Sequence, residues 1–360
     1  MASVNLTNAK NTKNDEFYTQ YYDIEKEVNA YLEFNPDVFK DKIILCPCDD
    51  PEWSNFTRYF AQNFEKLKLK KLISTSYAFK SKGVKGKYLI TIFERKNPKF
   101  DKDKVEIKGK NFTLIEDRNK DNRIDINDLD YKYLEGDGDF RSEEVTKLRD
   151  EADIIVTNPP FSLFRGFLAW IVEAKKQFLI IGNINAITYK DVFPLIKNNK
   201  VWLGPSITSG DREFEVPKEI VDMNKFTGKI REGKYFQRVV GVRWFTNLEH
   251  GRRHLPIPLM EEAEIIKFVT KKPFKKYDNY EAIEVSLVKN IPKDYKGIMG
   301  VPISFLDKYN PNQFKILGSD YNVKEGMLPK LINPKWKGKM DRGYIDNQRI
   351  YTRIFIQHKI

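Results

Sequence analysis

A short run at residues 153–161, Asp-Ile-Ile-Val-Thr-Asn-Pro-Pro-Phe, constrains the fold of this chain more than any other stretch. Its apolar residues, 154–156, predict a buried parallel strand. The two prolines that follow cannot continue a strand or enter a helix interior, so the chain turns here in an extended shape. In open α/β sheets, ligands bind at the carboxyl ends of strands. The turn therefore presents Asn158, Pro159 and Phe161 where a ligand is expected.

This corner suits the transfer of a group to a planar amine. An exocyclic amine has two N–H donors, and the Asn158 side-chain oxygen and the Pro159 carbonyl oxygen can each accept one. Both acceptors would hold the nitrogen lone pair toward an electrophile, while Phe161 stacks on the ring that carries the amine. The alternative is a strand-ending turn with a core phenylalanine, since Asn-Pro is common in turns. The full motif after an apolar run is much rarer, so we predict that Asn158, Pro159, Pro160 and Phe161 are catalytic.

Asn-Pro-Pro-Phe is the amine-binding motif of S-adenosylmethionine-dependent amino-methyltransferases, and the chain resembles their EcoRI-type adenine-specific DNA methyltransferase branch. The resemblance covers most of the chain and rests on these stretches: Asp-Glu-Phe-Tyr-Thr at 15–19, Leu-Cys-Pro-Cys-Asp-Asp-Pro at 45–51, Leu-Glu-Gly-Asp-Gly-Asp-Phe-Arg-Ser at 134–142, residues 158–164, and Gly-Val-Pro-Ile-Ser-Phe-Leu-Asp-Lys-Tyr at 300–309. It implies S-adenosylmethionine as cofactor, double-stranded DNA as partner, and an adenine flipped out of the duplex for methylation at N6. It also allows for a cognate restriction endonuclease.

The resemblance also implies positions for the cofactor, in addition to Asn158. The segment containing Tyr18 and Thr19 would lie over it. An acid next to an aromatic residue would accept the amine of its adenine, and Asp139 with Phe140 fits this pair best, with Asp137 as the other candidate. The alternative for these acids is an Asx turn that caps the following helix.

The turn after the first predicted strand, residues 42–46, contains no glycine. A glycine-rich turn here would let the backbone approach a pyrophosphate closely, so such a cradle is not expected. The methionine end of the cofactor carries an ammonium group, which the carboxylates Asp49 or Asp50 would suit; we also count Cys46 among the predicted contacts. The second predicted strand, 71–74, ends without an acid, so the sequence names no ribose contact.

Residues 117–128 place oxygen-bearing side chains at the spacing of a calcium-binding EF-hand loop. The predicted ligands are Asp117, Asn119, Asp121, Asp125 and Asp128. The loop departs from the pattern because an asparagine replaces the turn glycine and an aspartate ends it. The alternative is an acidic surface insertion. A calcium ion would brace this insertion and take no part in methyl transfer.

Alternating strands and helices between residues 42 and 204 predict a parallel α/β sheet with right-handed crossovers. Residues 88–94 and 105–116 are expected to add antiparallel strands. With the resemblance, this pattern indicates a Rossmann-like class I methyltransferase sheet in residues 1–204, which would bind the cofactor. Residues 205–360 would form an α+β target-recognition region.

The charge of the chain favours a polyanionic partner. The formal net charge is +12, and residues 201–360 carry 29 Lys and Arg against 19 Asp and Glu, a net of +10. The basic residues after 224 are interleaved with aromatic ones, and a second basic cluster covers 330–353. The alternative is a generally lysine-rich, solvated surface. The predicted DNA contacts are Arg231, Lys234, Arg238, Arg243, Arg252 and Arg253.

Other features of the sequence exclude several classes of protein. No window approaches about 18 consecutive apolar residues, and the polar start lacks a signal-peptide core, so no membrane partner is expected. Two cysteines, Cys46 and Cys48, are too few for a structural zinc site and predict a reduced, cytoplasmic protein. Two alternative functions stay open: an acceptor in RNA, a cytosine amine or a protein glutamine, and a catalytically silent DNA-binding relative.

Overall fold

The strand predicted at residues 154–156 is present as β5 (Ile154–Thr157), and it lies inside a mixed sheet. The computed structural model describes residues 19–51, 54–78, 99–208, 212–216 and 228–359. The chain divides into two units: residues 1–184 with 209–248, and residues 185–208 with 249–360. The single boundary expected at residue 204 differs from this division, because residues 242–246 return to add a strand to the sheet of the first unit.

The central sheet of the first unit contains β5 and six further strands. In chain order, these are β1 (Ile43–Cys46), β2 (Lys71–Ser76), β3 (Lys110–Leu114), β4 (Asp130–Tyr133), β6 (Gln177–Asn183) and β11 (Val242–Thr246). Across the sheet they follow the order β4-β3-β2-β1-β5-β6-β11. Strands β1, β2 and β5 are buried along almost their whole length, as the apolar runs in the sequence predict.

The directions of the strands bring several loops to one edge of this sheet. Strand β1 pairs in parallel with β2 and β5, and β5 pairs in parallel with β6. Strand β3 is antiparallel to both β2 and β4, so β4 points the same way as β2. The chain leaves β1 toward β2 and later returns on the other side of β1 as β5. That reversal of strand order falls between β1 and β5, and ligands bind at the carboxyl ends of such strands.

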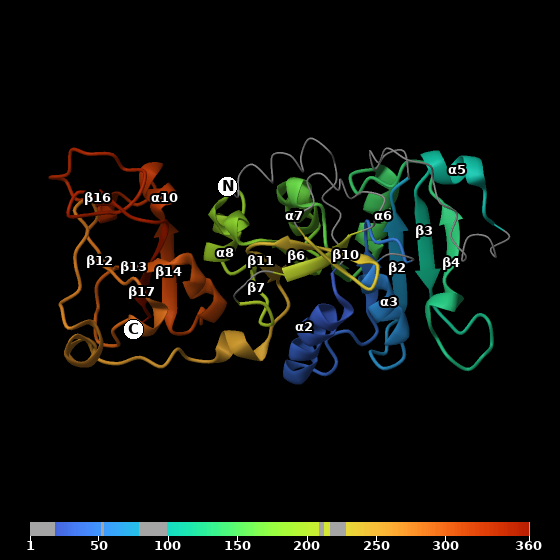
Figure 1. Cartoon of the computed structure of the whole chain (residues 1–360), viewed down its shortest axis with the longest axis horizontal. Coiled ribbons are helices and arrows are strands. Elements are labelled where there is room, and N and C mark those ends of the chain that lie inside the picture. The colour runs from blue at the N-terminus through green and yellow to red at the C-terminus, as the bar shows by residue number, and fades with distance from the viewer. Residues whose placement is uncertain (1–18, 52–53, 79–98, 209–211, 217–227, 360) are drawn as a thin grey trace. The chain divides into compact units, whose positions relative to one another are not determined.

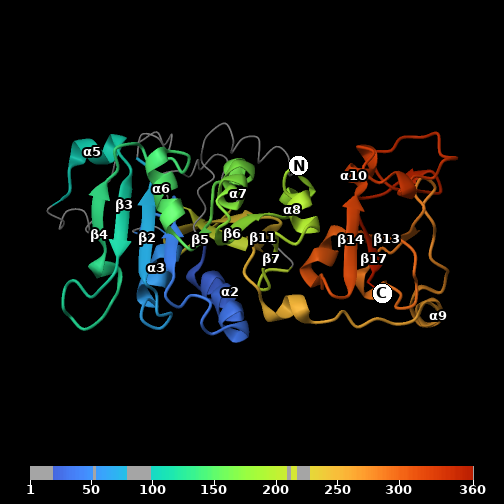
Figure 2. The ribbon, with the colours of Figure 1, turned by 180° about the vertical axis from the view of Figure 1, so that it is seen from behind.

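Helices cover both faces of the sheet, with α6 and α7 on one face and α2 and α3 on the other (Figures 1 and 2). Their bounds are Tyr21–Phe34 for α2, Asn55–Gln62 for α3, Glu143–Glu151 for α6 and Phe164–Glu173 for α7. Helix α3 begins where the Ser54 hydroxyl accepts the backbone N–H of Phe56, and it buries the aromatic side chains of Phe56, Tyr59 and Phe60. The layered arrangement agrees with the predicted α/β class.

One expected strand is partly helical. Residues 105–107 belong to α5 (Lys102–Ile107), and only Lys110–Leu114 forms a strand of the predicted segment 105–116. The cause is local, because the Asp101 side chain accepts the N–H groups of Asp103 and Lys104 and so caps a helix start. The other expected strand, residues 88–94, lies outside the described residues.

A small antiparallel sheet, in the order β8-β10-β9, also belongs to the first unit. Its strands are β8 (Arg212–Val216), β9 (Lys229–Arg231) and β10 (Lys234–Val239). All three residues of β9 are exposed, and most of β10 is half-buried. Several of the predicted DNA contacts lie on this sheet.

The second unit has its own sheet, in the order β12-β13-β17-β14. The strands are β12 (Ile283–Glu284), β13 (Met299–Pro302), β14 (Phe314–Ser319) and β17 (Arg353–His358), and the short helices α8 (Phe193–Lys197), α9 (Glu262–Glu264) and α10 (Asp320–Lys324) accompany them. A two-stranded hairpin, β15 (Tyr344–Ile345) and β16 (Gln348–Arg349), follows α10. The core next to this sheet includes Tyr277, Tyr280, Leu331 and Phe355.

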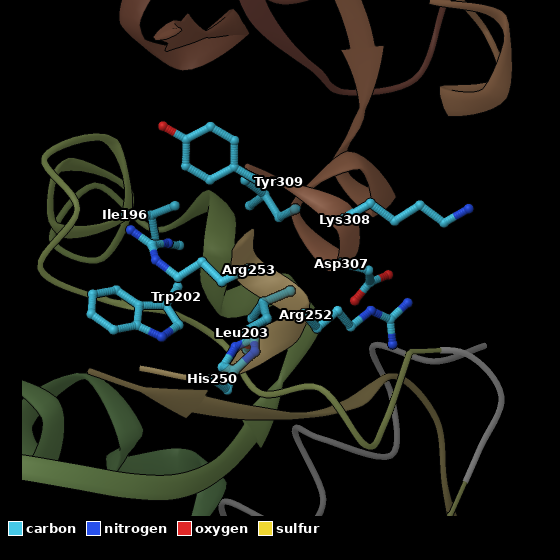
Figure 3. A pocket seen from close by; sticks show the side chains of 10 residues that line it. Ile196, Trp202, Leu203, His250, Arg252, Arg253, Asp307, Lys308 and Tyr309 are labelled. Carbon is cyan, nitrogen blue, oxygen red and sulfur yellow. The ribbon is translucent and has the colours of Figure 1, made fainter. Parts of the chain in front are cut away.

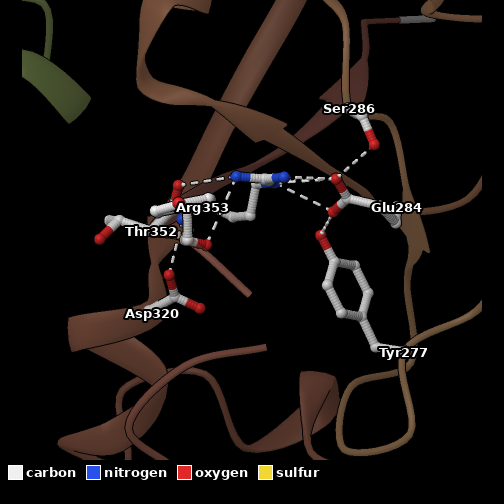
Figure 4. A network of polar contacts seen from close by, with 7 residues as sticks. Tyr277, Glu284, Ser286, Asp320, Thr352 and Arg353 are labelled. Carbon is white, nitrogen blue, oxygen red and sulfur yellow. Dashed lines mark hydrogen bonds and ion pairs between the residues drawn. The ribbon is translucent and has the colours of Figure 1, made fainter. Parts of the chain in front are cut away.

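A polar network is buried in the second unit (Figure 4). The Arg353 guanidinium pairs with the Glu284 carboxylate at 2.6 Å, and the Tyr277 hydroxyl donates to the same carboxylate. The fully buried Asp320 carboxylate accepts the backbone N–H of Arg353 at 2.6 Å and the Tyr280 hydroxyl at 3.2 Å. Burial raises the pKa of Asp320 from 3.8 to about 6.

We expect Asp320 to make the stability of the protein depend on pH. Because its folded pKa is raised, its contribution is fully present below about pH 4 and is lost as the pH rises through 6. The shift corresponds to about 3 kcal/mol. Urea unfolding measures the free energy of unfolding of the wild type and of Asp320→Asn, which does not titrate. The difference between these two free energies should change in favour of the wild type between pH 7 and pH 4. A difference that stays constant across this range contradicts the assignment.

Candidate active site

The carboxyl end of β5 is tied to the loop after β1 by the hydroxyl of Thr157, the last residue of β5. This hydroxyl lies 2.8 Å from the carbonyl oxygen of Pro47 and also contacts the carboxylate of Asp49. All three groups are buried. The contact therefore fixes the start of the Asn-Pro-Pro-Phe corner against the neighbouring strand.

Asp49 connects the loop to two further elements. Its carboxylate, 6% exposed, accepts the Ser54 hydroxyl at 2.7 Å, next to the start of α3. Its backbone carbonyl accepts the hydroxyls of Ser74, on β2, and of Thr57, on α3. Asp49 thus braces the loop, a role that the sequence did not suggest. Its predicted contact with the cofactor ammonium stays a prediction, and Asp50 is half-buried.

The corner itself is the turn that the prolines predict. Pro159 is buried, while Asn158 and Phe161 are half-buried. The Pro160 carbonyl accepts the N–H of Leu163 at 2.9 Å and starts a single 3₁₀ turn, Phe161–Leu163, which leads into α7. The corner is therefore held on both sides, by Thr157 before it and by this turn after it.

The predicted cofactor contacts Thr19, Cys46 and Tyr18 differ from one another in their surroundings. Thr19 is 3% exposed, and its hydroxyl has no hydrogen-bond partner among the described residues. The Asn55 side-chain amide donates to the Thr19 carbonyl at 2.7 Å, which places Thr19 next to the start of α3. Cys46 is fully buried, and burial raises the pKa of its thiol well above the usual range, so the thiol is a core group. Tyr18 lies outside the described residues.

The loop after β4 packs closely on the end of β2. Gly138 has a φ of +88°, and a Cβ there would lie 2.4 Å from the carbonyl oxygen of Ser76. The Ala78 N–H donates to the Asp137 carbonyl at 2.8 Å. Glycine is required at position 138 by this close packing as well as by its backbone conformation. The packing brings Asp137 and Asp139 to the same edge of the sheet as the corner.

Asp139 is half-buried and is paired with Arg141, whose guanidinium donates at 2.9 and 2.6 Å. The bonded guanidinium holds the pKa of Asp139 below its usual value. Phe140, by contrast, is buried, and its ring packs edge-on against Phe167 and Trp170 of α7, with centroids 5.0 and 5.4 Å away. The Phe140 ring is therefore a core group, and its predicted contact with the cofactor stays a prediction.

Tyr77 is a residue of this edge that the sequence analysis missed. It follows β2 directly and is half-buried, and burial raises the pKa of its hydroxyl well above the usual range. The Tyr77 hydroxyl contributes to the lowered pKa of Asp139 by hydrogen bonding. Its position immediately after a core strand that ends without an acid is the signal that could have found it.

The acidic loop at 117–128 is organised by its own backbone. The Asp128 carboxylate accepts the N–H groups of Arg118, Asn119 and Asp125 at 2.9–3.0 Å, and Asp117 accepts those of Lys120 and Asn122. Asn119, Asp121 and Asp125 each accept an N–H two residues later. Within the described residues, no group of three or more His, Cys, Asp or Glu is placed to hold a metal ion. The predicted calcium site is therefore not supported, and the loop fits the surface-insertion alternative.

The predicted DNA contacts divide into exposed and buried residues. Arg231, Lys234 and Arg238 are exposed on the β8-β10-β9 sheet, where Arg231 pairs with Glu213 at 2.8 Å. Arg243 is buried inside β11, whose five residues are all buried. Its burial removes it from the set of groups that can reach DNA.

Arg253 is also buried, beside a pocket of the second unit (Figure 3). Its guanidinium lies 4.0 Å from the centre of the Trp202 ring and donates to the Asn199 side chain at 3.0 Å. His250 lines the same pocket, and burial lowers its pKa to about 4, so it is neutral at pH 7. Arg253 is thus part of the packing, whereas the half-buried Arg252 donates to the Pro205 carbonyl at 2.9 Å.

The chain was compared with known proteins. A family model described as adenine-specific methyltransferase EcoRI matches residues 5–359. Type II methyltransferase M.EcoRI of Escherichia coli is 39% identical over 348 residues, which cover 96% of this chain and 97% of that protein. Type II methyltransferase M.MpnI of Mycoplasma pneumoniae is 35% identical over 356 residues, which cover 98% and 97%. No solved structure gave a significant match.

The chain belongs to the EcoRI family of adenine-specific methyltransferases. The resemblance noted in the sequence is confirmed, and the chain is an adenine-specific DNA methyltransferase. The mixed sheet with helices on both faces is consistent with a methyltransferase fold. Membership favours an adenine acceptor over the cytosine and glutamine alternatives. No helix in the described part of the chain is long and apolar enough to cross a membrane.

The family implies S-adenosylmethionine as methyl donor, and the edge of the sheet fits it. An unsatisfied buried hydroxyl is rare in proteins, and that of Thr19, beside the start of α3, has no hydrogen-bond partner among the described residues. Asp137 and Asp139 lie at the same edge, after β4. These hydroxyl and carboxylate oxygens can accept hydrogen bonds, so they suit the amine and hydroxyl groups of an aminoacyl nucleoside.

Replacing Thr157 with valine should destabilise the first unit. The change removes the hydroxyl that joins β5 to the Asp49 loop and leaves the buried Asp49 carboxylate with one donor fewer. We expect a loss of about 1–3 kcal/mol in the free energy of unfolding, measured by urea denaturation. Thr157→Ser, which keeps the hydroxyl, is the control and should lose much less. Equal midpoints for the valine variant and the wild type contradict the proposed brace.

Proposed function

We propose that this protein is a site-specific methyltransferase that moves a methyl group from S-adenosylmethionine to the N6 amine of an adenine flipped out of duplex DNA. The observation that carries the proposal is the Asn-Pro-Pro-Phe corner at the carboxyl end of β5, beside β1 at the reversal of strand order. The target amine cannot be reached inside a duplex, and flipping costs a few kcal/mol of unstacking.

The corner is proposed to position the adenine. The Asn158 side-chain oxygen and the Pro159 carbonyl accept the two N–H groups of the amine, and the half-buried Phe161 ring stacks on the base. With both hydrogens held, the nitrogen lone pair points out of the amine plane toward the methyl donor. Positioning of this kind supplies most of the acceleration, so no general base is required and the proton leaves during or after attack.

The loops at the same edge are proposed to hold the cofactor. When bound, S-adenosylmethionine supplies an electrophilic methyl group on its sulfonium sulfur. Thr19 is assigned to the cofactor, as is Tyr18, which lies outside the described residues, and Asp49 or Asp50 is assigned to the ammonium group. Asp139, with Asp137 next to it, accepts the adenine amine of the cofactor. The low pKa of Asp139 keeps this acceptor ionised at neutral pH.

The proposal also assigns a fold and a role to each part of the chain. The central sheet is assigned as a Rossmann-like class I methyltransferase sheet, which carries catalysis and the cofactor. Target recognition is assigned to the later part of the chain, with contacts at the exposed Arg231, Lys234 and Arg238 and at the half-buried Arg252. Phosphate contacts of this kind dominate affinity for DNA. We infer that the protein acts on DNA in the cytoplasm of a bacterial or phage-infected cell, beside a cognate restriction endonuclease.

We expect Asn158→Ala to abolish most of the activity. The variant lacks one of the two acceptors that hold the amine, and loss of a single preorganised polar contact in an active site costs about 100- to 1,000-fold in rate. Transfer of tritiated methyl groups to duplex DNA measures the effect, and duplex binding measured in parallel should be retained. Asn127→Ala, in the exposed acidic loop, is the matched control and should leave the rate unchanged.

The same assay shows whether duplex DNA, RNA or protein accepts the methyl group. RNA and protein offered in place of duplex DNA should receive no label, and sequencing of the methylated DNA should map the modified adenines to one sequence. Full activity of Asn158→Ala contradicts the mechanism. Label found only in RNA or protein contradicts the substrate.

A further inference from the structure

Among the described residues of the second unit, Tyr351 is the most exposed large hydrophobic side chain, with 86% of its surface accessible. It stands between the β15–β16 hairpin and β17. Single exposed aromatic side chains are common on protein surfaces. A binding role for Tyr351 therefore rests on the backbone and the charges around it.

The backbone that carries Tyr351 is anchored by a buried ion pair (Figure 4). The Arg353 guanidinium donates to the carbonyl oxygens of Tyr351 and Thr352 at 3.4 and 3.3 Å while it pairs with Glu284. A buried ion pair adds little net stability, although breaking it is costly. This one fixes where the chain enters β17, so the exposed ring stands on a rigid base.

The sequence just before Tyr351, residues 330–349, forms a basic segment. It contains six Lys or Arg residues and two Asp residues, a net charge of +4. Lys335, Lys337 and Lys339 are all exposed, and Trp336 between them packs on Tyr344 with ring centres 5.2 Å apart. This combination of positive charge and aromatic rings fits a nucleic acid.

The basic segment is held to the core of the second unit rather than left as a tail. The fully buried Asn279 donates from its side chain to the Arg342 carbonyl at 2.7 Å and accepts the N–H of Tyr344 at 2.9 Å. Its backbone carbonyl accepts the N–H of Asn333 at 3.0 Å. The hairpin turn is tied as well, because the Asp278 carboxylate accepts the N–H of Asn347 at 2.8 Å.

We propose that Tyr351 and the basic segment form a surface that binds duplex DNA, with the lysines on phosphates and the Tyr351 ring against a base or sugar in a groove. The inference rests on the proposed function, and it adds a contact surface that lies apart from the β8-β10-β9 sheet in the sequence. Charge complementarity selects the partner, since each lysine matches a phosphate of a duplex. The rigid support of the ring lowers the entropy lost on binding.

The first experiment measures binding of a fluorescent duplex that carries the methylation site, mapped beforehand with the wild-type enzyme. Tyr351→Ala should raise the dissociation constant about tenfold, the effect of losing one stacked aromatic contact. Tyr351→Phe should restore most of the affinity. Tyr22→Ala is the matched control, because Tyr22 is 66% exposed on α2. An unchanged dissociation constant for the alanine variant, with an unchanged melting temperature, overturns the proposal.

The second experiment tests the lysines through the salt dependence of duplex binding. Changing Lys335, Lys337 and Lys339 together to glutamine should reduce the slope of log affinity against log salt by about 3. The control changes Lys40, Lys66 and Lys70 to glutamine and so removes the same charge. These three lysines are exposed and precede β1 or β2 in the chain. Equal slopes for the two triple variants overturn the proposal. A wild type that binds no duplex overturns the proposed function itself.

Discussion

The buried contact between the Thr157 hydroxyl and the Asp49 carboxylate is the interaction on which the candidate site depends. It joins the carboxyl ends of β5 and β1, the two strands that flank the reversal of strand order. Asp49 extends the connection to Ser54 at the start of α3 and to Ser74 on β2. The corner that presents Asn158 is therefore fixed relative to three neighbouring elements. Such rigidity is what catalysis by positioning requires, because small displacements of reacting groups cost large factors in rate.

The loop after β1 shows how a site of this class manages without a glycine-rich turn. Cys48 takes the left-handed conformation there, with φ of +66°, and its N–H donates to the Thr75 hydroxyl at 3.2 Å. A side chain in this region is strained by about 1 kcal/mol, and the hydrogen bonds around Asp49 compensate for it. The glycine that the edge does require is Gly138, where the loop after β4 meets β2. The close approach of Gly138 thus serves packing between loops, while Thr19 and Asp139 are the polar groups proposed to contact the cofactor.

Local patterns in the sequence predicted the parts of the fold that are locally determined. The apolar run of β5 and the proline corner follow from residue type and spacing, and the structure contains both. Whether a polar side chain is buried by residues far away in the sequence could not be predicted from such local patterns. Arg243 was placed among DNA contacts because it stands next to aromatic residues, but those residues mark a core strand that returns to the first sheet. The sequence indicated Asp49 only as a possible contact of the cofactor ammonium, because its partners Ser54 and Thr157 are brought to it by the fold. The hydrogen bond of Tyr77 to Asp139 likewise depends on the fold, although the position of Tyr77 directly after β2 marks it in the sequence.

The central claim is that the corner after β5 holds the amine of an extruded adenine next to the methyl donor. An experimental structure of the protein with a duplex containing its methylation site and a non-reactive analogue of S-adenosylmethionine measures this most directly. The account predicts that the adenine N6 lies within hydrogen-bonding distance of the Asn158 side-chain oxygen and the Pro159 carbonyl, with the base stacked on Phe161 and the analogue at the ends of β1 and β4. An adenine amine bound by other residues, or a base left paired in the duplex with the analogue in place, contradicts it.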